Sequence, residues 1–346
     1  MAERSDDILK TPSGSVDIQY AHSSVNYQRR WEVYKLGEPR VDFHETAARE
    51  AELTGQERVL DVGCGDGSFA LDYLYGGRWN EHGRRFEGEV LGIDKHRNLI
   101  WGARERARLI GADNIGFKRL AAEKLAFDHE IEDESFDAAF VLFSGYYFQG
   151  SWLEALQRKL RPDAKLIVAT IGPDNKPWHR AFEAQMATWM SEVVRNKAWL
   201  NEIMNGGVRP DVLERILARF EEGFGSADRS EWQIHRPVVN TSRFNTVVAE
   251  DKLGRMFDIV KRYPSQWQLQ QMVVTPDTAD TYYDSLRSKQ TDFYPRPPAP
   301  LLNAAIENVV MPTIERSFDQ HGVFLDTADR SIFFCVNSKH PQSSAS

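Results

Sequence analysis

The chain has 346 residues, enough for one large α/β domain with additions or for two small domains. A hydrophobic content of 41%, with 19 Phe, supports a packed core and excludes global disorder, and a formal net charge of −8 argues against a nucleic-acid-binding surface. Two cysteines provide no disulfide framework, and no apolar run approaches the roughly 18 residues that a membrane span needs. Because the N-terminus is polar and lacks a signal peptide, we expect a soluble, cytoplasmic protein that binds neither nucleic acid nor membranes.

The first elements along the chain are predicted to lie ahead of the core. Residues 1–17 are polar and Ser-containing, so we expect a disordered tail there and another at residues 338–346. Residues 18–54 are expected to form N-terminal cap helices, including a helix over residues 41–53. The segment before that helix is aromatic, with Tyr20, Tyr27, Trp31 and Tyr34.

Strand-like and helix-like stretches then alternate through residues 55–174. Five strands are predicted, at residues 59–62, 89–94, 115–120, 136–143 and 165–171. Helices are predicted to begin near Leu71 and to cover residues 97–110 and 152–160. Continuous apolar strands that alternate with helices are typical of a parallel sheet covered on both faces, which predicts the α/β class.

Beyond Pro173 the predicted elements are mainly helical. Apolar side chains lie on one face of a helix over residues 182–200 and continue at similar spacing to residue 220, which predicts a helical insertion over residues 175–228. Residues 229–337 are expected to hold the final strands of the sheet and a second helical insertion. Their predicted elements are a strand at 232–239, mostly helix at 246–320 and a last strand at 331–336. The two insertions are expected to form a lid.

The most informative motif is the glycine-rich turn after the first strand. Gly63, Gly65 and Gly67 fall within five residues, between a short buried strand and the next helix. Such a turn brings backbone N–H groups and a positive helix end up to a ligand. We expect glycines there because a Cβ would block the close approach of that ligand. The turn therefore predicts a small-molecule binding loop.

Three further features follow the ends of predicted strands. Asp94 ends the second strand, 27 residues after Gly67, where a carboxylate can accept both hydroxyls of a ribose. Residues 121–125 follow the third strand and residues 143–146 the fourth. In an open parallel sheet all these turns, with Asp61 just before the glycines, lie at carboxyl ends and converge on one crevice.

Over about residues 55–172 these motifs resemble those of the class I S-adenosylmethionine-dependent methyltransferases. The family's first motif is matched by Asp61-Val-Gly-Cys-Gly-Asp-Gly, and its second by Gly92-Ile-Asp94. The third and fourth are matched by residues 122–125 and 135–137, and the turn into the fifth strand by residues 160–168. The resemblance implies a Rossmann-like, seven-stranded, mostly parallel sheet with helices on both faces and helical lid insertions.

The resemblance also implies a site for S-adenosyl-L-methionine, whose product is S-adenosyl-L-homocysteine. Asp61 would lie near the amino group of the cofactor, and Asp94 would hold its ribose. The methionine end would be wrapped by the loop residues Gly63, Cys64, Gly65 and Gly67. The methionine and the sulfonium would face the backbone near Phe143 and Ser144.

Two departures from the family pattern concern the adenine. Ala122 would meet the adenine edge through its backbone N–H, but Ala121 stands where the family often has an Asp that accepts a bond from the adenine amino group. Glu123 is the candidate substitute for that acceptor. Lys95 stands where an apolar residue often packs on adenine.

Residues that contact the acceptor are less tied to motifs. Tyr146 follows the fourth strand, where substrate walls often lie, and His179, at the start of the lid, is the best candidate for a general base. Tyr27 either folds over the cofactor as part of an N-terminal cap or packs against the lid. No Cys/His cluster has metal-ligand spacing, so no metal is predicted. A carboxylate or neutral amine acceptor would need no base.

The resulting hypothesis is a methyltransferase that moves a methyl group to an O, N or C atom of a small, apolar or aromatic metabolite by in-line displacement. We expect it to belong to secondary metabolism and to be a monomer or homodimer. An oxidoreductase with a dinucleotide cofactor would need a glycine where Ser68 stands, and a nucleic-acid adenine methyltransferase would carry an Asn/Asp-Pro-Pro-aromatic motif after the fourth strand. Ala121 leaves one alternative open, a scaffold or cyclase that binds the cofactor without methyl transfer.

Overall fold

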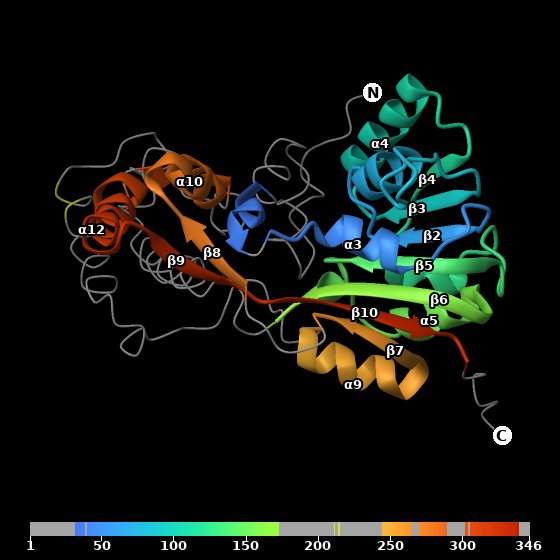
Figure 1. Cartoon of the computed structure of the whole chain (residues 1–346). Helices are drawn as coiled ribbons and strands as arrows, with labels where there is room; N and C mark the ends of the chain where they lie inside the picture. The colour runs from blue at the N-terminus through green and yellow to red at the C-terminus, as the bar shows by residue number, and fades with distance from the viewer. Residues whose placement is uncertain are drawn as a thin grey trace. The chain divides into compact units, whose positions relative to one another are not determined.

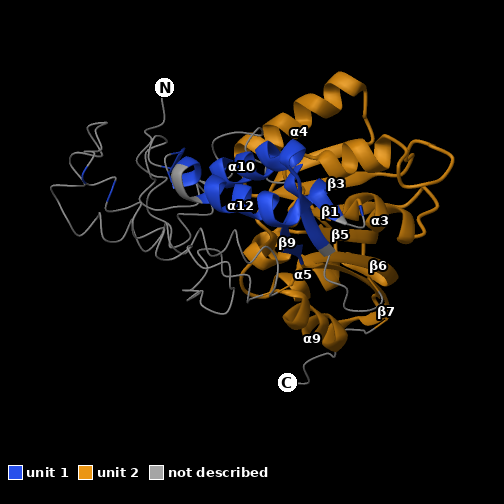
Figure 2. Ribbon diagram, turned by 60° about the vertical axis from the view of Figure 1, so that its left-hand side comes forward, with its two compact units in different colours: residues 1–40, 176–240, 270–328 blue, residues 41–175, 241–269, 329–346 orange. Residues whose placement is uncertain are grey.

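The computed structural model describes residues 32–38, 40–172, 211, 214, 244–264, 270–288, 302–303 and 305–338 (Figure 1). The chain divides into two compact units, each made of three segments (Figure 2). Unit 1 consists of Met1–Arg40, Lys176–Asn240 and Gln270–Ala328, and unit 2 of Val41–Asn175, Thr241–Leu269 and Asp329–Ser346. All the motifs of the predicted site therefore fall in unit 2.

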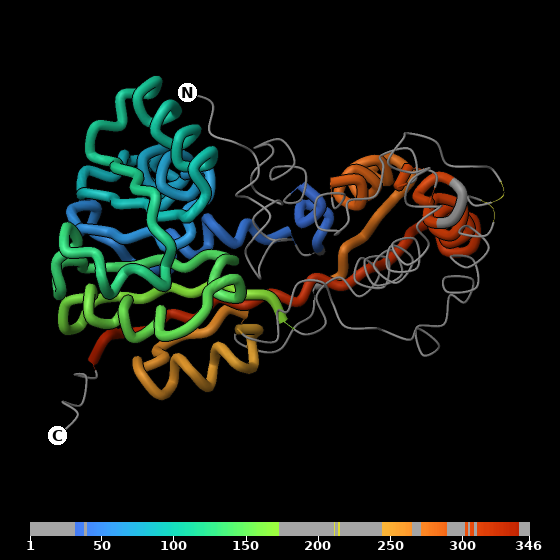
Figure 3. Tube along the Cα trace, turned by 180° about the vertical axis from the view of Figure 1, so that it is seen from behind, coloured from blue at the N-terminus to red at the C-terminus, as the bar shows by residue number. Residues whose placement is uncertain are grey.

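Unit 2 is built on a seven-stranded sheet in the order β4-β3-β2-β5-β6-β10-β7. Neighbouring strands from β4 to β6 run parallel, whereas β10 runs antiparallel to both β6 and β7. Figure 3 shows the last strand, β10, beside a strand from the first half of the chain. In chain order the strands are β2 (Val59–Val62), β3 (Val90–Asp94), β4 (Ile115–Arg119), β5 (Phe136–Leu142), β6 (Leu160–Ile171), β7 (Asp258–Tyr263) and β10 (Arg330–Val336).

Two groups of helices pack on this sheet. The first contains α3 (Phe43–Glu50), the π-helix η3 (Phe69–Tyr75) and α4 (Arg97–Ile110), joined by Tyr73–Asp42 and Arg106–Asp72 hydrogen bonds. The second contains the 3-10 helix η4 (Ala122–Phe127), α5 (Trp152–Lys159) and α9 (Thr246–Met256), and Gln157 of α5 donates to the Met256 carbonyl at 2.6 Å. The Rossmann-like, mostly parallel sheet predicted from the sequence is confirmed.

The central strands form because they are apolar on both faces. β2 is buried at every position, and β5 is buried at all positions except Asp137. Phe140 of β5 packs against Phe69 of η3, with ring centroids 4.6 Å apart. In an open parallel sheet with both faces covered, ligands bind in the crevice at the carboxyl ends of the strands, so the candidate site is sought at the turns that follow β2, β3, β4 and β5.

Unit 1 contains a small antiparallel sheet in the order β1-β8-β9, which the sequence did not predict. In its core the Tyr282 hydroxyl donates to the buried Asp326 carboxylate at 2.9 Å. Its strands are β1 (Gly37–Glu38), β8 (Gln270–Val274) and β9 (Phe324–Ala328). Its helices are η2 (Val33–Leu36), η8 (Pro276–Thr278), α10 (Ala279–Arg287), η10 (Ile306–Val310) and α12 (Met311–His321).

The prediction of mostly helix at residues 246–320 was too broad, because β7 and β8 lie inside that range. β7 is an edge strand with largely exposed side chains, so it lacks the apolar run that identified the central strands. The strand predicted at 232–239 lies outside the described residues, as does the insertion at 175–228 apart from residues 211 and 214. Its role as a lid stays a prediction. Among the described helices, none is long and apolar enough to cross a membrane.

Candidate functional site

The glycine turn is held by the neighbouring strand. The N–H groups of Gly63 and Cys64 both donate to the carbonyl of Ile93 in β3, at 2.8 and 3.0 Å. Gly63, Gly65 and Gly67 have φ values of +76°, +57° and +76°, a region that favours glycine. The chain can therefore reverse from β2 into η3 within a few residues.

The contacts at two of these glycines give a second reason for glycine, beside the close approach of a ligand, which stays a prediction. A Cβ at Gly63 would lie 2.5 Å from the Cβ of Ser144, and a Cβ at Gly67 would lie 2.6 Å from the Phe117 ring. The space is thus taken by the protein's own side chains, and close packing of the loop on the ends of β4 and β5 requires glycine there.

Ser144 and Phe143 join the ends of three strands. The Ser144 hydroxyl donates to the carbonyl of Val62 at 2.9 Å, and the Phe143 N–H donates to the carbonyl of Ala169 at 2.8 Å. Phe143 has a φ of +54°, a strained conformation for a residue with an aromatic side chain. Strain of this kind persists only where the surroundings enforce it, and here the bonds of Ser144 and Phe143 hold the backbone at the end of β5.

Asp61 is a buried carboxyl group under the loop. It is 2% exposed, and its Oδ2 has no hydrogen-bond partner among the residues that the structure describes. Burial raises the pKa of Asp61 to about 8, and the negative charges of Asp94 and Asp66 act in the same direction. A positively charged ligand group would relieve this cost, so the position suits a cation.

Asp94 lies at the end of β3 with its carboxylate already oriented. Its Oδ2 accepts a bond from the Gly65 N–H at 3.1 Å, and its Oδ1 accepts from the His96 N–H and lies 2.8 Å from His96 Nδ1. Asp94, the residue predicted to bind the ribose, therefore lies next to the glycine loop, as its position at the end of the strand implied.

The far side of the loop is held by an arginine that the sequence analysis missed. Arg106 of α4 donates to the Asp66 carbonyl at 3.2 Å and the Ser68 hydroxyl at 3.1 Å, and it forms a bidentate pair with Asp72 at 2.8 and 2.9 Å. Asp66 in turn accepts from the Ser68 N–H and hydroxyl. No sequence motif indicated this clamp, because it depends on the packing of α4 on η3.

Of the predicted adenine residues, Ala122 and Glu123 follow β4 and Lys95 follows β3. Ala122 is buried at the start of η4, and the Glu123 carboxylate accepts a bond from the Gln149 N–H at 2.8 Å. Glu123 thus connects the turn after β4 to the turn after β5. The Lys95 carbonyl accepts a bond from Arg119 at 3.1 Å.

Tyr146 is buried in the turn after β5, with its ring 4.5 Å from that of Tyr147. Cys64 is buried, and burial raises the pKa of its thiol well above the usual range, so it is a small packing residue and not a nucleophile. Tyr27 and His179 lie outside the described residues, so their roles stay predictions. The described part of the chain has no group of His, Cys, Asp or Glu that could hold a metal ion.

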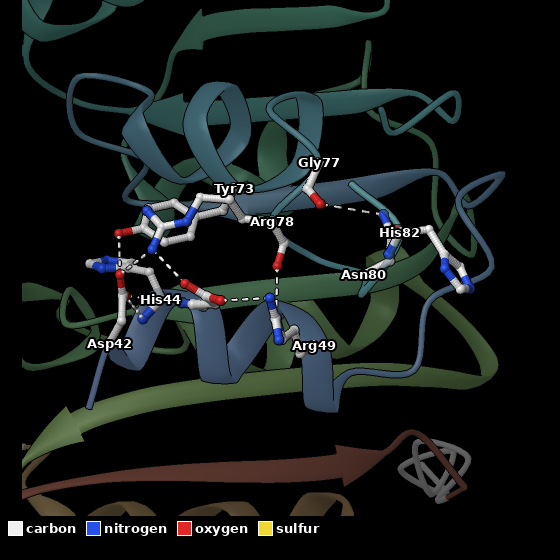
Figure 4. A network of polar contacts seen from close by, with 9 residues as sticks. Asp42, His44, Arg49, Tyr73, Gly77, Arg78, Asn80 and His82 are labelled. Atoms are coloured by element: carbon white, nitrogen blue, oxygen red, sulfur yellow. Dashed lines mark hydrogen bonds and ion pairs between the residues drawn. The ribbon is translucent and has the colours of Figure 1, made fainter. Parts of the chain in front are cut away.

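His44 at the start of α3 was not singled out from the sequence. Its ring lies 5.9 Å from that of Phe143 and 5.4 Å from that of Tyr73. Figure 4 shows His44 next to Asp42, which caps α3 and receives bonds from Tyr73 and Arg78. Burial lowers the pKa of His44 to about 4, partly offset by Asp42. The imidazole is therefore neutral at pH 7.

The contacts of Arg330 show that the start of α3, with His44, lies near the carboxyl end of β6. Arg330 begins β10 opposite Ile171, the last residue of β6, and its guanidinium lies 4.1 Å from the ring centroid of Phe43. The charge of Arg330 further lowers the pKa of His44. The signal in the sequence was only an Asp two residues before a histidine at a helix start, which many helices share.

The sheet and its helices define a Rossmann-like fold, with a candidate cofactor site at the carboxyl ends of its strands. A model of the family described as "Methyltransferase domain" matches residues 53–233, just over half of the chain. The chain belongs to this family, the class I S-adenosylmethionine-dependent methyltransferases.

Two curated relatives carry similar sequences. The sterol 4-C-methyltransferase strm-1 of Caenorhabditis elegans is 28% identical over 148 residues, 40% of this chain and 38% of that protein. The uncharacterized methyltransferase YcgJ of Bacillus subtilis is 25% identical over 122 residues, 35% of this chain and 43% of that protein. The chain thus spans about two fifths of the length of these relatives. The crystal structure of YcgJ aligns with a TM-score of 0.43 and 13% identity, over 86% of this chain and 98% of that chain.

Proposed function

We propose that this protein transfers the methyl group of S-adenosyl-L-methionine to an O, N or C atom of a small apolar or aromatic metabolite. The observation that carries the proposal is the acidic surrounding of the glycine loop. Asp61, Asp66 and Asp94 all lie at the loop, and Asp61 is buried. Phosphates of a dinucleotide would be repelled there, whereas S-adenosylmethionine carries an ammonium and a sulfonium and no phosphate.

The residues present fit this cofactor. Asp61 would pair with the amino group, the loop from Gly63 to Gly67 would surround the methionine end, and Asp94 would bind the ribose. Ala122 would meet the adenine edge through its N–H. When bound, the cofactor supplies a methyl group on a positively charged sulfur, already activated for displacement by an acceptor atom.

The protein's own part is then alignment, exclusion of water and removal of a proton. Phe43 of α3 packs against Phe143 at the end of β5, and Tyr146 is buried in the turn that follows; these rings would form apolar walls of the site. Where the acceptor atom carries a proton, that proton must leave as the bond between the acceptor atom and the methyl carbon forms. His44 packs against Phe143 and is neutral at pH 7, but a pKa of about 4 makes its imidazole a weak base for this proton. His179 remains the candidate in the predicted lid.

An apolar acceptor is supported by these aromatic walls and by the sterol named for one relative. We place the reaction in secondary metabolism and in the cytoplasm, carried out by a monomer or homodimer without a nucleic-acid or membrane partner.

Two measurements test the proposal. Calorimetry should show that the purified protein binds S-adenosylhomocysteine, and Asp94→Ala should weaken that binding by about 1.5–3 kcal/mol, the scale of a hydrogen bond to a charged group. Incubation with methyl-labelled S-adenosylmethionine and a metabolite extract should label a small organic compound. Absence of binding would refute the cofactor assignment, whereas tight binding with no labelled compound would favour a scaffold or cyclase.

A further inference from the structure

The carboxylate of Asp94 is already engaged by three donors of this chain. Oδ1 lies 2.8 Å from both the backbone nitrogen and the ring Nδ1 of His96, and Oδ2 lies 3.1 Å from the Gly65 nitrogen. The side chains of His96 and Asp94 are only 12% and 11% exposed, so water does not compete freely for these positions. An ionised carboxylate only accepts, so the His96 ring donates through Nδ1.

The position of the His96 ring is not explained by helix capping. His96 is the N-cap of α4, a position at which side chains usually accept bonds from the first N–H groups of the helix. Within the described part of the chain the His96 side chain makes no such bond. It turns back to Asp94 instead, which points to a role at the carboxylate.

A carboxylate offers about four acceptor positions, two on each oxygen. The two His96 donors fill Oδ1, and the Gly65 N–H takes one of the two positions on Oδ2. One position remains, on Oδ2, while a ribose presents two neighbouring hydroxyls. This differs from the expectation above that Asp94 accepts from both.

We propose that His96 limits Asp94 to a single hydroxyl of the cofactor ribose. His96 is then a positioning residue: it fixes the carboxylate and leaves Oδ2 as the one acceptor facing the ligand. The inference rests on the proposed function, because it requires that the loop binds an adenosyl compound. Its consequence is unequal recognition, in which the loss of one ribose hydroxyl is costly and the loss of the other is not.

The test uses calorimetry with S-adenosylhomocysteine and its 2′-deoxy and 3′-deoxy analogues on the full chain. For the unmodified protein we expect one analogue to bind roughly 10- to 100-fold more weakly and the other within about threefold of the parent compound. In His96→Ala, Oδ1 loses its ring donor, so both analogues should bind at least about fivefold more weakly than the parent compound. In His96→Asn, the side-chain amide can donate to Oδ1 again, and the unequal pattern should return.

Two results would overturn the inference alone: equal losses for both analogues in the unmodified protein, or an unchanged unequal pattern in His96→Ala. A merely structural role for His96 would weaken all three ligands by the same factor, which also contradicts the proposal. If His96→Ala does not fold, His96→Phe takes its place, because it keeps an aromatic ring but has no donor for Oδ1, and the same loss of the unequal pattern is expected. Failure of the unmodified protein to bind S-adenosylhomocysteine refutes the proposed function, and this inference with it.

Discussion

Asp61 should lose a proton when the cofactor binds. Burial and the nearby charges of Asp94 and Asp66 raise its pKa to about 8 in the protein without ligand. An ammonium group beside the carboxylate would stabilise the ionised form and lower that pKa sharply. Binding at neutral pH should therefore expel the proton that Asp61 holds.

The size of the effect follows from the pKa. With a pKa of about 8, Asp61 holds ~0.9 proton at pH 7 and ~0.1 proton at pH 9. If the bound state is fully ionised, ligand binding releases those amounts. The release from this group should thus nearly vanish over two pH units, which distinguishes it from a group with an ordinary carboxyl pKa.

The assay is calorimetric titration with S-adenosylhomocysteine in buffers that differ in ionisation enthalpy. Asp61→Asn is the matched variant, because the amide has the same shape and cannot ionise. The free ligand is the same in both titrations and its amino group is mostly protonated at pH 7, so at that pH the difference between the two proteins is assigned to Asp61. Equal proton release by the unmodified protein and by Asp61→Asn at pH 7 would show that Asp61 does not meet the cation.

Three further changes test the loop. The folded pKa of Asp61 lies above its unfolded value, so as the pH rises from about 4 to 8 this group lowers the free energy of unfolding by ~1.4 kcal/mol per pH unit. In chemical denaturation of Asp61→Asn, the free energy of unfolding should therefore fall less steeply with pH. An unchanged slope would contradict the raised pKa of Asp61. Gly63→Ala should lower the free energy of unfolding, measured by thermal denaturation, by about 2–4 kcal/mol, because of the positive φ at this position and the clash with Ser144. Adding Ser144→Gly should restore only the part that is due to the clash with Ser144. Arg106→Met should weaken S-adenosylhomocysteine binding several-fold and lower the free energy of unfolding by about 1 kcal/mol. The surface variant Arg108→Met should change neither quantity. Equal effects of the two variants would show that Arg106 does not hold the loop.

The central sheet was predictable because its signal is local. Strands such as β2 and β5 are apolar at nearly every position, which burial on both faces requires, and the last strand, β10, has the same composition. β7 was missed for the opposite reason. It pairs on one side only, so its polar residues are tolerated at an edge position that is defined by the neighbouring strand and not by the sequence. β8 lies in the middle of the other sheet, but it begins with two glutamines and its apolar run is only three residues long, which is too short to identify a strand.

The site divides in the same way. The glycine turn and Asp94 were predicted because each follows the end of an apolar strand, a feature that can be read within a few residues. His44 and Arg106 could not be found, since their partners lie on other elements. Arg106 reaches a loop nearly 40 residues earlier in the chain, and His44 depends on Phe143 and on Arg330 at the far end of the chain.

Charge explains how a loop shared by many folds comes to suit one kind of ligand. The N-terminal end of a helix carries about half a positive charge, which favours the binding of phosphate in a dinucleotide site. In this loop burial raises the pKa of Asp61, and the negative charges of Asp94 and Asp66 add to that effect. The ligand of the proposed function brings positive charge next to Asp61 and a neutral sugar next to Asp94. An adenosyl sulfonium with an amino group meets both conditions, and a phosphorylated nucleotide meets only the second.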